Sequence, residues 1–375
     1  MTENNQTGWT DQAVPDAAWT CESCGAKVEF AAGTAALSCP YCGHRQNIAA
    51  VPRQVREHAI GELAQLPARP MAAPGDGVKT FVCPGCKAVT ESDALSDRCQ
   101  FCATALVADA SLTERVVPEA VLPFELDRNA ARDALKKWTS SRWFAPSSLK
   151  KVSEAETFKG TYLPHWTYDT NTVSDYRGER GEHYYETETY TETVDGQTQT
   201  RTRQVQKTRW WPAHGTVQRF FDDELVAGTT TVKEKQLDKL TPWPLEHAVP
   251  YQQEYLAGFR TLRYDVEPET GLETAKQRMA TVIEQDCRQD IGGDEQRVHR
   301  VETAYSDTTF KLLLLPVWFL TYLHAGKPHQ VMVNARTGEV IGERPYSAAK
   351  IAAAVLAALA VIAVVVLLVS MRSHG

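Results

Sequence analysis

The residues best suited to chemistry are cysteines near the start of the chain, where eight of the nine fall into four Cys-x-x-Cys pairs. The first set is Cys21, Cys24, Cys39 and Cys42, and the second set is Cys83, Cys86, Cys99 and Cys102. Each Cys-x-x-Cys turn places two sulfurs on one side of a knuckle, and spacers of 14 and 12 residues leave room for a short β-hairpin between two knuckles. Four thiolates at about 2.3 Å suit the tetrahedral coordination of Zn²⁺. The spacing therefore predicts two zinc ribbons, over residues 21–45 and 81–106, with one Zn²⁺ in each.

Both predicted sites are structural rather than catalytic, because four thiolates leave no coordination position open to a substrate. Such a metal supplies folding free energy on the order of 10 kcal/mol or more. A thioredoxin-like redox pair, which needs a βαβ context, and an iron–sulfur centre are the alternatives. The residue after the second cysteine of a knuckle favours glycine, because φ is positive there. The first ribbon has Gly25 and Gly43 at these positions, whereas the second has Lys87 and Ala103, so we expect more strain at the second site.

Zinc ribbons commonly bind either nucleic acid or another protein, and the charge of the ribbon sequence distinguishes the two functions. Residues 1–110 carry 8 Lys and Arg against 12 Asp and Glu, and the whole chain has a formal net charge of −7. Phosphate binding requires clustered basic residues, and the ribbon sequences contain no such cluster. Protein contact is therefore favoured, and a nucleic-acid-binding role in replication or transcription is the alternative.

Composition divides the rest of the chain into segments. Residues 1–20 are polar and acidic without the apolar core of a secretory signal, so we expect a disordered N-terminus that stays in the reducing cytosol. Residues 52–66 have apolar side chains at helical spacing and predict a short amphipathic helix. Residues 67–80 are rich in Pro, Gly and Ala, which predicts a linker. Residues 120–346 alternate helical and strand-like patterns and predict a mixed α+β body.

Two helices are expected inside this body. The first covers LDRNAARDALKKW, with Asp127 as its N-cap. The second covers GLETAKQRMATVIEQDCRQDI and ends at Gly292 and Gly293. Its predicted apolar stripe consists of Leu272, Ala275, Met279, Ile283 and Cys287. Cys287, the ninth cysteine, is therefore interpreted as a buried structural thiol.

A short motif, Leu-Pro-x-Trp, occurs at residues 163–166 and again 152 residues later at 315–318. Each copy opens a strand-like run. The repeat could arise by chance in a β-rich composition. Alternatively, it marks two related β-units that flank the long helix. Both explanations stay open at the level of sequence.

A polar hairpin is predicted around Asp195-Gly196, a strong two-residue turn between two alternating runs. This turn sets the cross-strand pairs, which are Thr193 with Thr198, Thr191 with Thr200, Thr189 with Thr202, Glu188 with Arg203 and Tyr190 with Arg201. Neither face is apolar enough for a core, so we expect an arm in water. It is either a solvated ribbon with no role or a surface that pairs with another chain.

The segment 351–369 contains 19 residues without a charge or a helix breaker. As a helix it is roughly 28 Å long, close to the ~30 Å hydrocarbon core of a bilayer. We therefore predict one transmembrane helix, followed by a short tail over residues 370–375. Arg344 and Lys350 before the span favour a cytoplasmic location for the N-terminal bulk of this single-pass protein of the cell membrane.

Catalytic motifs are missing from the sequence. There is no G-x-x-x-x-G-K-[ST], no H-E-x-x-H and no G-x-S-x-G, and the ten histidines do not cluster. We therefore expect no catalytic residues, no small-molecule cofactor site and no enzymatic activity. An enzyme whose active site lies in the α+β body is the remaining alternative.

Several stretches resemble a family of bacterial membrane-anchored double zinc-ribbon proteins. They are FELDRNAARDALKKWTSSRWFAP, PYQQEYLAGFRTLRYDV, LLLLPVWFLTY and VMVNARTGEVIGERPYSAAKI, and with the ribbons they cover most of the chain. Members are often labelled as TFIIB-type zinc-ribbon proteins or as relatives of the primosomal helicase, although this chain has no ATP-binding phosphate loop. The resemblance implies a band-7-like or virion-core-like partner at stressed membranes, in a phage-shock-like complex.

These expectations combine into one hypothesis. Two zinc ribbons sit at the distal end of a cytosolic α+β body, which carries a long polar hairpin and is held to the membrane by one C-terminal helix. The protein is then a non-enzymatic adaptor or scaffold for other membrane-associated proteins.

Overall fold

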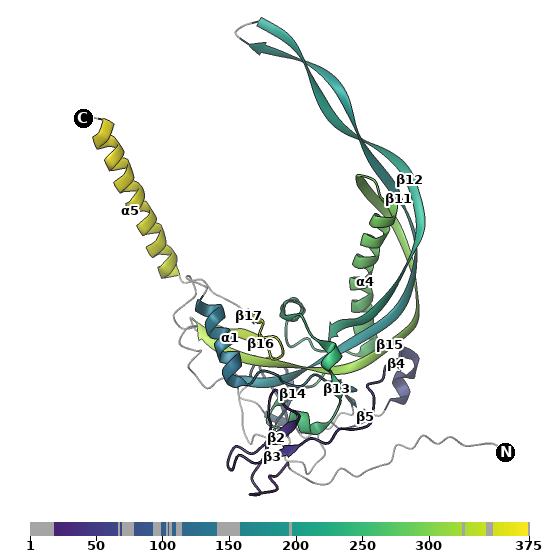
Figure 1. The fold of residues 1–375 in the computed structure, drawn as a ribbon, viewed down its shortest axis with the longest axis vertical. Coiled ribbons are helices and arrows are strands. Elements are labelled where there is room, and N and C mark those ends of the chain that lie inside the picture. The colour runs from purple at the N-terminus through teal and green to yellow at the C-terminus, as the bar shows by residue number, and fades with distance from the viewer. Residues whose placement is uncertain are drawn as a thin grey trace, which may run out of the picture.

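The computed structural model describes residues 19–66, 68–69, 79–92, 99–102, 104, 107–109, 115–140, 158–194, 197–324, 327–342 and 348–373. Four antiparallel strands in the order β12-β11-β15-β16 form the centre of a large mixed sheet (Figure 1). Their bounds are β11 Lys159–Val194, β12 Gln197–Ala227, β15 Glu295–His324 and β16 Lys327–Asn334. Helices pack against this sheet, so the predicted α+β class is correct. The disordered N-terminus expected over residues 1–20 lies outside the described residues up to position 18.

The middle of the sheet is buried on both faces, as the apolar run in β15 requires. Residues 310–320 are all buried, and a strand that is covered on both faces shows such a run instead of alternation. Helix α1 (Arg128–Ser140) packs against β16 and β17 (Val340–Gly342). Helix α4 (Pro268–Ile291) lies in the concave curve of β11, β12 and β15 (Figure 1).

The two Leu-Pro-x-Trp motifs belong to two similar units that face each other across the centre of the sheet. One unit is β10 (Ala120–Val121), α1, β11 and β12, and the other is β14 (Arg260–Leu262), α4, β15 and β16. Strands β11 and β15 are antiparallel with Leu163 opposite Leu315. Strand β10 runs parallel to β15 and strand β14 runs parallel to β11, at equivalent positions. The units are thus related by an approximate two-fold axis and exchange their first strands.

Equivalent hydrogen bonds fasten both units. The indole of Trp166 donates to the carbonyl of Val266 at 2.8 Å, and the indole of Trp318 donates to the carbonyl of Leu126 at 2.9 Å. Each carbonyl lies two residues before the helix of the opposite unit. Because the same contact recurs at matching positions, the motif echo reflects two related β-units and not chance.

Both predicted helices are present. The carboxylate of Asp127 accepts a hydrogen bond from the backbone N–H of Ala130 at 2.8 Å and caps α1. Helix α4 begins at Pro268, three residues before the predicted start, because proline suits the first turn of a helix. Gly292 ends it with φ 64°. The predicted stripe is buried in full, namely Leu272, Ala275, Met279, Ile283 and Cys287.

The polar hairpin has the predicted register, with Thr189 opposite Thr202, Tyr190 opposite Arg201 and Val194 opposite Gln197. The predicted turn residues 195 and 196 lie outside the described residues. The strands are much longer than the predicted arm, because their lower halves belong to the central sheet. Figure 1 shows the paired strands extending away from the body.

The first ribbon packs on the body and is not a distal domain. Its sheet contains β1 (Glu29–Phe30), β2 (Ala36–Ser38) and β3 (Arg45–Asn47). The backbone N–H of Phe30 donates to the carbonyl of Ala257 at 2.9 Å, and that of Gly33 donates to the carbonyl of Phe124 at 2.9 Å. The ribbon was expected at the distal end of the body, but burial of its apolar face holds it against the body instead.

The second ribbon is part of the large sheet. Its strands are β6 (Lys79–Val82), β7 (Val89–Ser92) and β8 (Val107–Asp109). Strand β7 pairs with β14, with Thr261 opposite Glu91. Residues 79–80, expected in the linker over residues 67–80, therefore belong to a strand. Within that segment, β5 (Ala68–Arg69) also pairs with β9 (Arg115–Val116).

The prediction of an amphipathic α-helix over residues 52–66 is wrong. The segment contains the short strand β4 (His58–Ala59) and the 3-10 helix η1 (Ile60–Gln65). Strand β4 pairs with residues 309–310 of β15, so hydrogen bonding to the sheet edge replaces an α-helical turn. The apolar spacing still packs Ile60, Leu63 and Leu66 against the cluster around α4.

Short elements connect β12 to β14. They are α3 (Glu234–Leu237), η2 (Asp238–Leu240), η3 (Leu245–His247), β13 (Val249–Pro250) and η4 (Gln253–Leu256). The C-terminal helix α5 (Ala348–Ser373) follows the body.

Candidate metal centres and their surroundings

The first cysteine set forms a compact four-sulfur group. The Sγ atoms of Cys21 and Cys42 are 3.5 Å apart, and those of Cys24 and Cys39 are 3.6 Å apart. Four sulfurs at about 2.3 Å from a tetrahedral zinc lie roughly 3.8 Å from one another, so the spacing fits a bound Zn²⁺. Cys21 and Cys39 are buried, whereas Cys24 and Cys42 are exposed.

The knuckles hold these sulfurs through short backbone turns. The N–H of Gly25 donates to the carbonyl of Cys21 at 2.8 Å, and the N–H of Gly43 donates to the carbonyl of Cys39 at 3.0 Å. Both glycines have positive φ, 70° and 73°, as the sequence predicted. The backbone N–H of Cys42 lowers the pKa of Cys39 to about 7, which favours the thiolate that binds a metal.

The second set has the same plan. The Sγ distances are 3.3 Å for Cys83 to Cys102 and 3.5 Å for Cys86 to Cys99. Lys87 adopts φ 63° and donates its backbone N–H to the carbonyl of Cys83 at 2.9 Å. A non-glycine residue therefore occupies the left-handed position, which supports the predicted strain at this site. Ala103, the other predicted exception, lies outside the described residues.

Each set brings together the four predicted ligands and could hold one metal ion. Four thiolates in a tetrahedral arrangement suit Zn²⁺ and leave no open position. The chemistry available to these sites is thus to fix the ribbon fold, not to activate a substrate. The metal would also stabilise the thiolate of Cys99, whose pKa burial raises well above its usual value.

A third group of titratable side chains was not predicted. Glu57, Asp169 and Asp223 gather around Lys311, whose Nζ lies 2.7 Å from Glu57 and 2.5 Å from Asp223. Lys311 is only 9% exposed. A buried ammonium needs such partners, and here it occupies the place that a metal cation would take. We therefore interpret the group as an ion network that neutralises Lys311.

This network sits where β11 leaves the core. Both ladders of β11 shift register beside Asp169, between Tyr168 and Thr170 towards β12 and between Asp169 and Asn171 towards β15. Asp223 on β12 has φ 52°. Burial, followed by the hydrogen bond with Glu57, raises the pKa of Asp169 to about 7. The four residues are far apart in the sequence, and the one signal that could have revealed the group is Lys311 at the start of an apolar run.

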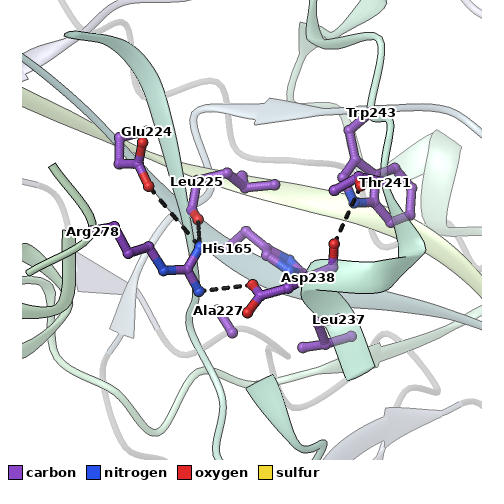
Figure 2. A pocket seen from close by; sticks show the side chains of 9 residues that line it. All are labelled: His165, Glu224, Leu225, Ala227, Leu237, Asp238, Thr241, Trp243 and Arg278. Atoms are coloured by element: carbon purple, nitrogen blue, oxygen red, sulfur yellow. Dashed lines mark hydrogen bonds and ion pairs between the residues drawn. The ribbon is translucent and has the colours of Figure 1, made fainter. Parts of the chain in front are cut away.

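A cavity of about 290 Å³ lies between β11, β12 and α4. Figure 2 shows Arg278 at its side, where its guanidinium approaches Asp238 and the carbonyl of Leu225. Arg278 also pairs with Glu234 at 2.5 Å. These carboxylates already compensate the arginine, so the cavity presents no free cation to an anionic ligand.

His165 lines the same cavity and is 3% exposed. Its Nδ1–H donates to the carbonyl of Leu163 at 3.2 Å, and burial lowers its pKa to about 4. The imidazole is therefore neutral near pH 7. Together these contacts describe a satisfied core histidine beside a structural ion pair.

Cys287 is fully buried on α4, as predicted. Burial raises the pKa of its thiol, which makes it a weak nucleophile.

Helix α5 is long and apolar enough to cross a membrane. Its 26 residues span about 39 Å, and the window Ala354–Met371 has a mean hydropathy of 3.1 with none of it buried against the protein. Leu356, Val361 and Val369 are each more than 60% exposed. This length and composition match those of a helix that spans a bilayer.

Comparison with known proteins gives one informative similarity. The chain is 25% identical to the "Uncharacterized protein YdjG" of Bacillus subtilis (strain 168) over 341 residues, which cover 89% of this chain and 92% of the relative. No protein-family profile matches, and no solved structure matches. The similarity therefore extends over most of both chains, and the relative's printed name assigns no activity.

Proposed function

We propose that this protein is a membrane-anchored zinc-ribbon adaptor. Helix α5 holds it in the cell membrane with its N-terminal bulk in the cytoplasm. Two structural Zn²⁺ ions shape the ribbons, and the hairpin above the sheet contacts other membrane-associated proteins.

The observation that carries this proposal is the long β11–β12 hairpin. Beyond Gly181, which lies opposite Glu295 at the end of β15, β11 pairs only with β12 among the described residues. From residue 182 to 192 nearly every side chain is exposed, including Tyr184 and Tyr185. Exposed aromatic side chains and open strand edges are suited to protein contacts.

The apolar surface of α5 supports the anchor. A row of exposed Val, Leu and Ile side chains gains free energy in lipid, at about 25 cal/mol per Å² of apolar surface removed from water. The resemblance described above adds a band-7-like or virion-core-like partner as the protein contacted, in a phage-shock-like complex.

Affinity purification of the full-length protein from native membranes, followed by mass spectrometry, tests this role. We expect a set of membrane-associated proteins whose recovery is unchanged by nuclease. The matched control replaces residues 184–207 with Asn-Gly, which shortens the hairpin in register because Tyr184 lies opposite Lys207. Recovery of partners should fall in this variant while zinc content stays the same.

Two outcomes would contradict the proposal. Recovery of replication or transcription proteins that disappear with nuclease would assign the ribbons to nucleic acid. Recovery of the same partners with the shortened hairpin would remove the hairpin as the contact surface.

A further inference from the structure

The outer part of the β11–β12 hairpin, residues 182–194 and 197–209, is here called the arm. At its base, His183 and Thr208 contact Asp294 and Glu295. Beyond this contact no third strand among the described residues pairs with the arm, since β15 begins at Glu295, opposite Gly181. A two-stranded ribbon is marginally stable in water. Its two outer edges also present unpaired backbone groups that can pair with another strand.

Charge in the arm is sorted by strand. The β11 strand of the arm carries the acidic residues Glu182, Glu186, Glu188 and Glu192 and no Lys or Arg. The β12 strand carries the basic residues Arg201, Arg203, Lys207 and Arg209 and no Asp or Glu. One outer edge of the arm is therefore acidic and the other is basic.

The charged side chains share one face of the ribbon. Glu188 pairs with Arg203 at 3.3 Å, Glu186 with Lys207 at 2.6 Å, and Glu192 with Arg201 at 3.3 Å. Arg209 lies over the ring of Tyr184 on the same face, 4.9 Å from its centroid. The register places Thr and Gln side chains on the opposite face, including Thr189, Thr202 and Gln204. The ladder inside one arm thus shows how an acidic and a basic strand of this composition fit together.

The same match is available between two arms. When two copies stand side by side in the same orientation, β12 of one copy runs antiparallel to β11 of the next. The basic edge then meets the acidic edge, with the charged faces continuous. Charged edges of like sign repel and protect a sheet from association, whereas the opposite signs found here attract.

We propose that the arm binds the arm of a second copy of this chain, by edge-to-edge pairing of β12 with the partner copy's β11. The contact is heterologous, because the two copies use different edges. A pair of copies leaves one acidic edge and one basic edge unpaired, one on each copy, so the arms can assemble in a row. This contact needs neither the metal ions nor any other protein.

The test uses the full-length protein in detergent micelles, with its mass measured by sedimentation. We expect self-association at low ionic strength, where the Debye length is about 30 Å, and loss of it in about 1 M salt, where that length is about 3 Å. The variant with residues 184–207 replaced by Asn-Gly should remain a single copy. A wild-type protein that stays a single copy, or a shortened variant that still associates, would overturn the proposal.

Charge reversal provides the sharper experiment. One variant, R201E/R203E/K207E, has two acidic edges, and a second variant, E186K/E188K/E192K, has two basic edges. Each alone should be a single copy, and an equal mixture should associate again. The chain with all six substitutions keeps every pair within the arm in reversed order, so it should associate like wild type. Each triple variant places like charges opposite each other within the arm, so amide hydrogen exchange checks that its two strands remain paired. A mixture that stays unassociated although both triple variants keep a paired arm would refute pairing through opposite charge.

The outcome is separable from that of the adaptor proposal, because purified protein alone is measured. Self-association without membrane partners would support the arm contact and contradict the adaptor. Partner recovery without self-association would do the reverse.

Discussion

The two cysteine sites share ligands and spacing but differ in how the body holds them. The first site belongs to a separate small sheet, β1-β2-β3, that packs on the body through an apolar face. The second site takes Cys83 and Cys86 from between β6 and β7 and Cys99 and Cys102 from between β7 and β8. Strand β7 continues the large sheet through β14. A metal at the first site would thus stabilise a docked unit, and a metal at the second would stabilise part of the main sheet.

The side chains around each site show the same difference. Phe30 of the first ribbon packs against Tyr255, with ring centroids 5.2 Å apart, in a connection between strands. Phe101 of the second ribbon packs edge-on against Phe319 of the central strand β15, at 5.1 Å. The carbonyls of Gln100 and Phe101 also accept hydrogen bonds from the side chains of Thr321 and Gln330. Loss of the second ribbon should therefore disturb the pairing of the sheet itself, whereas loss of the first should uncover one side of the core cluster that contains Tyr162 and Trp318.

Removal of one ligand from each site should have the largest effect. Cys39→Ser and Cys99→Ser should each reduce the zinc content from two ions to one, because three thiolates bind the metal far more weakly. Each lost ion removes stabilisation of its ribbon on the order of 10 kcal/mol. Metal analysis of the full-length protein measures the first expectation.

Amide hydrogen exchange then separates the sites. Cys99→Ser should accelerate exchange in β7, β14 and the neighbouring part of β11, whereas Cys39→Ser should accelerate it mainly in residues 19–47. Equal effects on the central sheet would break the comparison. A zinc content near zero in the wild-type protein would show that the two sites cannot be compared as metal sites.

Truncation of the two packing phenylalanines should have the next largest effect. Phe30 and Phe101 are 4% and 3% exposed, and removal of a buried phenyl ring costs about 3–5 kcal/mol. Phe101→Ala should lower the denaturant midpoint of the whole body, because its ring packs on β15. Phe30→Ala should lower that midpoint less, because its ring packs on Tyr255 outside the central strands, and should expose the first ribbon to protease.

Measurement of the zinc content of both variants controls for damage to the metal sites themselves. Both variants should retain two zinc ions, because neither phenylalanine is a ligand. A common fall in the midpoint for both variants would show that the first ribbon is as integral to the body as the second.

Local patterns explain what the sequence predicts correctly. The four Cys-x-x-Cys pairs, the Asp127 cap and the register of the hairpin each depend on residues within one short segment. The α4 stripe and its glycine stop depend on periodicity alone. These features are specified before any tertiary contact forms, so sequence reasoning reaches them.

Long-range contacts explain what the sequence does not reveal. The pairing of β7 with β14 joins residues about 170 positions apart, and no local pattern specifies that contact. The segment 52–66 has helical spacing, yet β15 draws His58 and Ala59 into a strand pair. Lys311 and its carboxylates meet only because three separate strand regions converge at one irregularity.

The smallest expected effect concerns the knuckle residue after the second cysteine. Lys87 has φ 63°, where Gly25 and Gly43 have 70° and 73°. A left-handed conformation costs a residue with a Cβ about 1–2 kcal/mol, so Lys87→Gly should stabilise the second site by up to this amount. Gly43→Ala should destabilise the first site by a similar amount, and no neighbouring atom within 4 Å would add a clash.

Competition with a zinc chelator measures both changes as the concentration needed to remove each ion. Lys87→Gly should raise this concentration for the second site, and Gly43→Ala should lower it for the first. Lys87→Ala is the matched control, because it removes the same charge and keeps the Cβ. If Lys87→Ala protects the second ion as well as Lys87→Gly does, the side-chain charge and not the backbone conformation distinguishes the two knuckles.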